Sequence, residues 1–360
     1  MSYYVLGTVA SFSFLASLIP FIPIAHGAVR VFDFGRLQLA LLSITTTIFV
    51  LAILPINWIS LIFLAMLVAA LAIQTIYIIR FTPLWAQQSA KHSTDSKGED
   101  VISLFVCNVK QGNRRYQDLI KLINTRDPDI LILMETDQQW VDALDASLTE
   151  YAQKISCPQD NSYGMYLTSR LEMPSGEIKY LLNEGIPSFH CSFKVTDGHL
   201  FDLISIHPDP PVPHRDTQGR DAEILVAGKL AAKRQRPLIV TGDLNDVAWS
   251  ETTRRFLRIS QLLDPRQGRG MFNSFDARFP FLRWPLDHVF HSEEFELVSI
   301  ERQPHIGSDH FPMFYEFALV FKNDNSLPDD ATADDREEAE RLIDTEKNRS
   351  RKPVGEDWEG

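Results

Sequence analysis

Two polar side chains directly after an apolar run are the first candidates for chemistry. Residues 238–240 are apolar, and Gly242, Asp243 and Asn245 follow them closely. A short apolar run that ends at a glycine is typical of a buried strand, although the same polar residues are also common in turns. Because side chains two residues apart lie on the same side of an extended chain, Asp243 and Asn245 would point into the same space. A carboxylate beside a carboxamide can orient and deprotonate an attacking water.

Acid, amide and imidazole side chains also stand at the ends of several other apolar runs. They are Asn108, Glu135, His207, Asp287, Asp309 and His310. Clustered carboxylates repel one another, so a group of this kind is favourable where a cation neutralises it. Mg²⁺ takes oxygen ligands and keeps waters beside a phosphate, and a nearby histidine can donate to phosphoryl oxygens. The pattern predicts metal-assisted hydrolysis of a phosphate ester, with Mg²⁺ or Mn²⁺ as the cofactor.

The elements that must position these side chains lie in a domain that we predict at residues 101–322. Apolar runs predict strands at 101–106, 130–134, 163–168, 188–195, 200–206, 238–240, 288–290 and 313–321, and helical spacing predicts helices at 114–124, 140–148 and 221–234. Strands and helices mixed over this length predict an α/β or α+β domain with one large core. The three cysteines match no metal-ligand spacing, so we expect them to be bystander thiols.

The first 86 residues have the composition of a membrane region. Three runs without charge, at about 3–24, 37–54 and 59–79, approach the roughly 20 residues that cross the hydrocarbon core as a helix. We therefore predict three transmembrane helices. The alternative for the first run is a cleavable signal peptide, since Ala25-His26-Gly27 resembles a cleavage site. The absence of Lys and Arg before the run argues against cleavage.

Charge outside the apolar runs bears on topology and on partners. Arg30 and Arg36 in the first loop and Arg80 after the third run predict, by the positive-inside rule, a protein of a bacterial inner membrane with its domain in the cytoplasm. The polar residues 87–100 predict a flexible linker, and residues 323–360 predict an acidic disordered tail. The net charge of −12 argues against a protein that coats nucleic acid by bulk electrostatics.

The order of the motifs resembles the endonuclease/exonuclease/phosphatase superfamily, which includes deoxyribonucleases, sphingomyelinases and inositol polyphosphate phosphatases. The matching segments are 105–109, 128–135, 169–170, 205–207, 242–245, 286–289 and 308–310. Each segment is a weak signal alone, but their common order is specific. The resemblance implies an α+β fold, a four-layer sandwich of two β-sheets packed face to face with helices outside. It covers the domain and neither the apolar helices nor the tail.

The same resemblance assigns expected roles to the metal-binding side of the site. Glu135 would be the principal metal ligand, with Asn108 and Asp309 in or next to the metal shell. Arg170 follows the Ser-Arg pattern of the family and would brace the substrate side of the site.

For catalysis, the resemblance assigns the base for the attacking water to Asp243, with Asn245 as its orienting partner. His207 and His310 would contact the scissile phosphate, with Asp287 or Asp309 orienting a histidine.

The substrate is less determined by the residues than the reaction. A membrane-tethered nuclease or phosphodiesterase, a lipid or inositol phosphoesterase, and a non-catalytic membrane scaffold are the three hypotheses. We expect Arg269 to bind substrate, and with the stretch 278–285 it mixes arginines with aromatic residues, which suits stacked bases, an acyl chain or the membrane surface. The alternative is that Phe279, Phe281 and Trp284 are packed core. Lys110 stands where abasic-site endonucleases carry an acid, which disfavours DNA repair. The expected partners are the membrane and a phosphodiester in nucleic acid or a phospholipid headgroup, with no stable protein partner.

Overall fold

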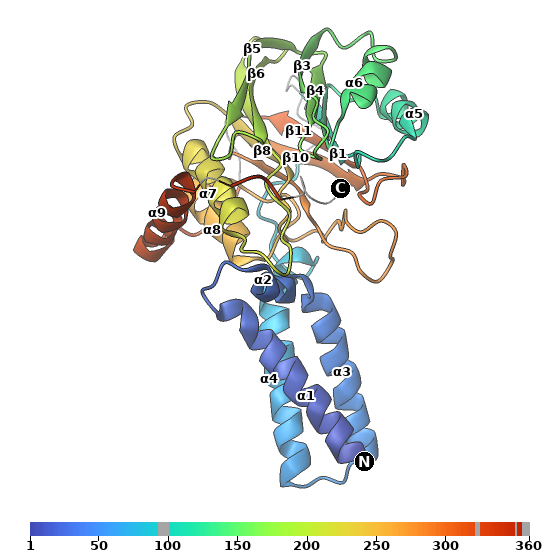
Figure 1. Cartoon of the computed structure of the whole chain (residues 1–360), viewed down its shortest axis with the longest axis vertical. Helices are drawn as coiled ribbons and strands as arrows, with labels where there is room; N and C mark the ends of the chain where they lie inside the picture. The colour runs from blue at the N-terminus through green and yellow to red at the C-terminus, as the bar shows by residue number, and fades with distance from the viewer. Residues whose placement is uncertain (93–100, 321–324, 350, 355–360) are drawn as a thin grey trace. The chain divides into compact units, whose positions relative to one another are not determined.

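The computed structural model describes residues 1–92, 101–320, 325–349 and 351–354 (Figure 1). The chain forms two compact units. The first contains Met1–Ala86 and Pro211–Thr217, and the second contains Gln87–Pro210 and Gln218–Gly360.

Three helices of the first unit are long and apolar enough to cross a membrane. They are α1 (Ser2–Leu18), α3 (Arg36–Ile53) and α4 (Trp58–Ile78), and short 3₁₀ turns, η1 (Ile19–Phe21) and η2 (Ile79–Phe81), extend α1 and α4. Asn57 caps α4 by accepting hydrogen bonds from the backbone of Ile59 and Ser60. These helices match the three apolar runs closely, and they are joined by a further short helix that we did not predict, α2 (Gly27–Phe34).

Residues 211–217 pack against the start of α2 although they lie far from it in sequence. Gly27 N donates to Arg215 O at 2.9 Å, and Thr217 N donates to Ala25 O at 2.9 Å. A Cβ on Gly27 would lie 1.9 Å from Val212 O, so only glycine permits this approach. Residues 211–217, which follow His207 along the chain, therefore belong to the first unit.

The second unit is built on two mixed β-sheets. The six-stranded sheet has the order β10-β11-β1-β2-β4-β3, from Phe295–Arg302, Met313–Leu319, Val101–Asn108, Ile130–Met134, Met165–Ser169 and Gln153–Cys157. The five-stranded sheet has the order β5-β6-β7-β8-β9, from Glu172–Tyr180, Pro187–Lys194, Leu200–Ile206, Leu238–Asp243 and Asp287–His291.

Helices cover the outer face of each sheet. In Figure 1, α5 (Tyr116–Arg126) and α6 (Gln138–Asp145) lie on one side of this unit, and α7 (Gln218–Ala232), α8 (Glu251–Ser260) and α9 (Ala333–Lys347) lie on the other. The predicted four-layer α+β sandwich is thereby confirmed.

Alternating side chains in β1 explain why the layers pack in this order. Leu104 and Val106 belong to the core between the sheets, whereas Phe105 and Cys107 belong to the core under α5 and α6. A strand that is buried on both faces reads as a continuous apolar run, because each face supplies one layer. In β8, Ile239 likewise belongs to the core between the sheets, whereas Leu238 and Val240 belong to the core under α7 and α8.

Strand register brings the ends of both sheets to one site. β1 and β2 are parallel with Asn108 opposite Met134, so Glu135 follows beside Asn108. β7 and β8 are parallel with Ser205 opposite Thr241, which brings His207 to the level of Asp243.

The predicted linker is partly ordered. Lys91 forms a parallel bridge with Leu297, and the side chain of Gln88 accepts a hydrogen bond from Asp264 N at 2.9 Å. Residues 87–92 are therefore packed on the second unit rather than free, and residues 93–100 lie outside the described part of the chain.

The prediction of disorder for the tail is wrong over residues 333–347, which form α9. Thr332 and Asp335 make a capping box, and Asp335 also pairs with Arg258 at 2.5 Å. Ala339, Leu342 and Ile343 are buried although the segment is mostly charged. Three small or medium apolar residues at helical spacing suffice here because α7 and α8 already offer an apolar surface.

A buried histidine makes the stability of this unit sensitive to acid. His291 Nδ1 lies 2.8 Å from Ser292 O, so Nδ1 carries the proton, and Nε2 then accepts from Ser89 Oγ at 2.8 Å. The ring is completely buried, and this burial lowers the pKa of His291 to about 4.

We expect the free energy of unfolding to fall between about pH 6.5, the pKa of an unfolded histidine, and pH 4. Folding holds the ring neutral, so the stabilisation is complete above pH 6.5 and roughly 3 kcal/mol is lost as pH falls through this window. Urea unfolding of the full chain in detergent with EDTA should show a shallower loss for His291→Asn than for the wild type. An identical pH dependence in the two proteins would contradict the assignment.

Candidate active site

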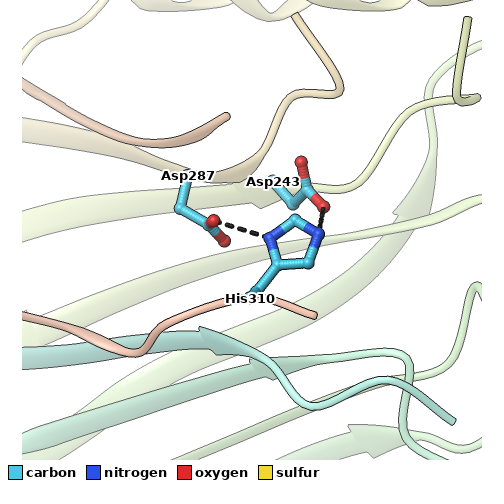
Figure 2. Close-up of side chains that lie close together, drawn as sticks. All are labelled: Asp243, Asp287 and His310. Carbon is cyan, nitrogen blue, oxygen red and sulfur yellow. Dashed lines mark hydrogen bonds and ion pairs between the residues drawn. The ribbon is translucent and has the colours of Figure 1, made fainter. Parts of the chain in front are cut away.

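Three buried side chains from three segments meet at the end of β8 (Figure 2). His310 lies between two carboxylates, with Nδ1 2.8 Å from Asp287 Oδ2 and Nε2 3.4 Å from Asp243 Oδ2. Burial opposes a charged ring, but Asp287 and Asp243 outweigh it and raise the pKa of His310 to about 10. The ring therefore carries two protons at neutral pH and acts only as a donor.

Asn108 connects the two sheets at this site. Its Nδ2 donates to Glu135 Oε1 at 2.8 Å and to Asp243 Oδ2 at 3.0 Å. Glu135 Oε2 also accepts from Gln111 N at 3.1 Å, and Glu135 has a left-handed backbone with φ of 59°. Burial raises the pKa of Glu135 to about 7, so this carboxylate is costly to keep charged without a cation.

The turn after β8 orients Asn245 toward the loop that carries His207. Asn245 N donates to Asp243 Oδ1 at 3.0 Å, and its Nδ2 donates to Pro208 O at 3.0 Å. A Cβ on Gly242 would lie 1.9 Å from Ile206 O, so the glycine allows β7 and β8 to approach here. The Gly-Asp-Leu-Asn sequence thus places its two polar side chains by a constraint of the backbone.

His207 has the opposite electrostatic character to His310. Its Nε2 lies 3.8 Å from Asp243 Oδ2, and burial lowers the pKa of His207. Within the described part of the chain, its Nδ1 has no hydrogen-bond partner. The two histidines on either side of Asp243 therefore differ in protonation, which is the arrangement expected of an acid–base site.

The donor set of the site fits a divalent metal ion. Glu135 and Asp243 share a single amide group, and Asp243, Asp287 and His310 offer ligand atoms that all lie within 4.8 Å of one another. Both nitrogens of His310 already face carboxylates, so the ring could bind a metal only by giving up one of these ion pairs. Oxygen ligands suit Mg²⁺ and Mn²⁺ better than imidazole does.

Asp309, predicted in or next to the metal shell, is engaged by cations of the chain. Its Oδ2 lies 2.8 Å from Lys110 Nζ and 3.7 Å from an Arg278 nitrogen. Lys110 was not among the predicted site residues, and its position two residues after Asn108 is the sequence signal that could have indicated it. Ser308 Oγ ties this segment to β1 by donating to Asn108 O at 2.7 Å.

The placement of two predicted substrate residues does not support that role. Ser169 pairs with Ile130 at the start of β2, so Arg170 lies at the opposite end of the strand from Glu135, where it pairs with Asp127 at 2.5 Å. Antiparallel pairing is the reason, because it reverses the direction of β4.

Arg269 binds the start of the second unit. Its Nη2 donates to Ser89 O at 2.7 Å and to Gln87 Oε1 at 3.1 Å. Both arginines are thus bound by other parts of the chain, Arg170 by Asp127 and Arg269 by residues 87–89.

The profile of the endonuclease/exonuclease/phosphatase family matches residues 106–310, more than half of the chain. The chain belongs to this family. Its members are hydrolases that act on phosphate esters and generally depend on a divalent metal. The match begins inside β1 and ends at His310, so it spans every side chain of the candidate active site.

Solved structures of the family share the fold at low sequence identity. A family protein from Bacteroides thetaiotaomicron is 19% identical, with a TM-score of 0.52 over 63% of this chain and 98% of that chain. TDP2 of D. rerio, complexed with a single-strand DNA product, is 16% identical, with a TM-score of 0.52 over 61% and 99%. The human Nocturnin catalytic domain with bound sulfate is 17% identical, with a TM-score of 0.51 over 62% and 98%. No curated protein matches the chain.

Proposed function

We propose that this protein is a membrane-anchored, divalent-metal-dependent phosphoesterase that hydrolyses phosphodiester bonds. The observation that carries the proposal is the buried carboxylate of Asp243, which lies between the doubly protonated His310 and the amide of Asn108. Asn108 and Asn245 hold the two oxygens of this carboxylate, and the cation of His310 lies beside it where negative charge develops during hydrolysis.

The residues divide into a metal side and a water side. Glu135 and Asn108 would hold Mg²⁺ or Mn²⁺, which supplies positive charge for the phosphoryl oxygens when it is bound. Asp243 accepts the proton of the attacking water, and Asn245 keeps that water in line. His310 and His207 contact the phosphate, and Asp287 keeps the ring of His310 oriented.

We expect metal binding to stabilise the protein through Glu135. At a Mg²⁺ concentration about 100 times the dissociation constant, binding adds about 2.7 kcal/mol to the free energy of unfolding. Glu135→Gln should abolish the increase in Tm that Mg²⁺ causes, and Glu177→Gln on the exposed edge strand β5 should retain it. An equal increase in all three proteins would place the ion elsewhere.

A nucleic acid is the substrate that we propose first. The related D. rerio TDP2 is known with a single-strand DNA product, and Phe275 and Arg278 lie beside the site here. The ring of Phe275 is 4.8 Å from that of His310, and Arg278 is 3.7 Å from Asp309. An aromatic ring and an arginine at the edge of the site suit a base and its phosphate.

A lipid headgroup is the second candidate, because the loop after Phe275 exposes apolar side chains. Phe279 is 52% exposed and Phe281 is 89% exposed. An apolar loop of this kind suits a lipid surface, and three helices of the chain could span a bilayer.

The arginines at residues 30, 36 and 80 support a cytoplasmic domain, which a C-terminal reporter active only in the cytoplasm would test.

A substrate panel tests the proposal. The full chain in detergent, with Mg²⁺ or Mn²⁺, would be offered single- and double-stranded DNA, RNA, sphingomyelin, phosphoinositides and a generic phosphodiester. Nucleic-acid cleavage that needs the metal supports the first candidate, and cleavage confined to lipids supports the second. Silence on every substrate with metal bound would overturn the proposed function and favour the membrane scaffold.

A further inference from the structure

The C-terminal segment, Arg351–Val354, reaches the residues behind His207. Val354 N donates to Asp209 Oδ1 at 2.9 Å, and Arg351 Nη2 donates to Asp209 Oδ2 at 3.2 Å. The hydroxyl of Tyr163 lies 2.6 Å from Asp209 Oδ1 and also contacts Val354 O. Val354 and Asp209 are 2% and 4% exposed. A segment predicted to be disordered thus buries Val354 against Asp209, two residues after His207.

Arg351 neutralises a buried group of acids at this position. It pairs with Glu346 at 2.6 Å as well as with Asp209, and burial raises the pKa of Asp209 and of Glu223. Among the described residues, Glu223 Oε1 has no hydrogen-bond partner. Removing a cation from such a cluster leaves buried charge uncompensated, which costs more than the ion pair itself contributes. The segment is therefore bound by charge as well as by packing.

The guanidinium of Arg351 also sits directly on α7. A Cβ on Gly219 would lie 1.6 Å from Arg351 Nη2, so the glycine makes room for it. Pro353 packs on Gly185 in the same way, where a Cβ would lie 2.7 Å from the proline ring. Asn183 Nδ2 donates to Arg351 O at 3.2 Å. Gly219, Gly185 and Asn183 thus form the surface on which residues 351–354 pack.

The link to the active site runs through Tyr163 and through residues 207–209. The ring of Tyr163 lies against that of His207, with centroids 5.7 Å apart. Asp209 is two residues after His207, and Pro208 O between them accepts from Asn245 Nδ2. Residues 207–209 are held by Asn245 on one side and by the C-terminal segment, acting on Asp209, on the other.

We propose that the C-terminal segment is a positioning element of the active site, which holds His207 through Tyr163 and Asp209. The inference rests on the proposed function only for its kinetic readout. It makes Arg351 a positioning residue that acts through other side chains and touches no substrate. Misplacing a phosphate-binding side chain by about 1 Å costs on the order of 100-fold in rate.

Two variants of the full chain test the inference with a matched control. Arg351→Ala should lower kcat roughly 10- to 100-fold with little change in KM. Arg351→Lys should recover part of the loss because it restores the charge. Lys347→Ala, which removes an exposed cation of α9 that pairs with Asp344 at 3.9 Å, should stay within about twofold of the wild type, because an exposed pair of this kind contributes little.

A second readout does not need catalysis. With the ten histidines labelled at Cε1, NMR of the full chain should show the His207 signal, assigned with His207→Asn, shift in Arg351→Ala and stay in place in Lys347→Ala. If no substrate is cleaved even by the wild type, the proposed function fails and this signal alone decides the inference. An unmoved His207 signal in folded Arg351→Ala overturns the inference, whether or not kcat has fallen.

Discussion

Replacing Asp243 with Asn should reduce phosphodiester hydrolysis about 1,000-fold while the protein remains folded. General bases contribute on the order of 10² to 10⁴ to rate, and this carboxylate also balances the charge of His310. Asn has the same shape, and its oxygen can still accept the hydrogen bond from Asn245 N. The substitution removes the buried negative charge and puts an amide NH2 where Oδ2 accepts from Asn108 Nδ2, so we expect a large loss in kcat together with a lower Tm of a protein that still folds.

The measurement is kcat and Tm for Asp243→Asn beside Asp202→Asn. Asp202 lies on β7 of the same sheet and pairs with Ser192 and Arg236, away from the site. Its variant should keep at least half of the wild-type rate. If Asp243→Asn retains more than a tenth of the rate, Asp243 is not the base and another group must take the proton from water.

The part of the site that could be predicted from sequence is the part set by strand ends. Asn108, Glu135 and His207 each follow an apolar run at once, and Asp243 follows one after two residues. Parallel pairing within each sheet brings such ends together. Local pattern and three-dimensional position coincide there, because the strand that carries the residue also sets its direction.

The residues that could not be predicted depend on contacts between distant segments. Arg170 also follows a strand, but the antiparallel pairing of β4 with β2 carries it to the far end of the sheet. Arg269 is used by the backbone of Ser89, some 180 residues away in sequence. No local pattern contains the direction of a neighbouring strand or the partner of a long side chain.

The order of the C-terminal residues could not be predicted either, because its stabilisation comes from the rest of the domain. Composition predicts that a charged, apolar-poor segment does not repay its ordering entropy. That argument holds for an isolated segment. In the folded domain, however, Asp335 pairs with Arg258 on α8, and Val354 is buried against Tyr163. Contacts with surfaces of the rest of the domain offset the entropy that is lost when the tail is ordered. The composition of the tail alone does not contain these contacts, so it cannot predict this order.

Replacing Asp287 with Asn should lower kcat by roughly 100- to 1,000-fold and change the pH dependence of the remaining activity. Asp287 is 2% exposed, and its Oδ2 lies 2.8 Å from His310 Nδ1. The amide oxygen of Asn can still accept from Nδ1, so the ring keeps its place. After burial, which opposes protonation, Asp287 is the main cause of the raised pKa of His310, and without it that pKa falls from about 10.

A neutral ring with its proton on Nδ1 presents a lone pair at Nε2 toward Asp243, where the wild type presents a donor. The protonated form is lost as pH rises through the pKa of His310, so the alkaline limit of kcat should lie at lower pH in Asp287→Asn than in the wild type. Asp145→Asn, an exposed acid paired with Lys154 on the other sheet, should leave rate and pH limit unchanged. A reduced kcat with an unshifted alkaline limit would mean that Asp287 supports the fold of the site and does not hold the proton on His310.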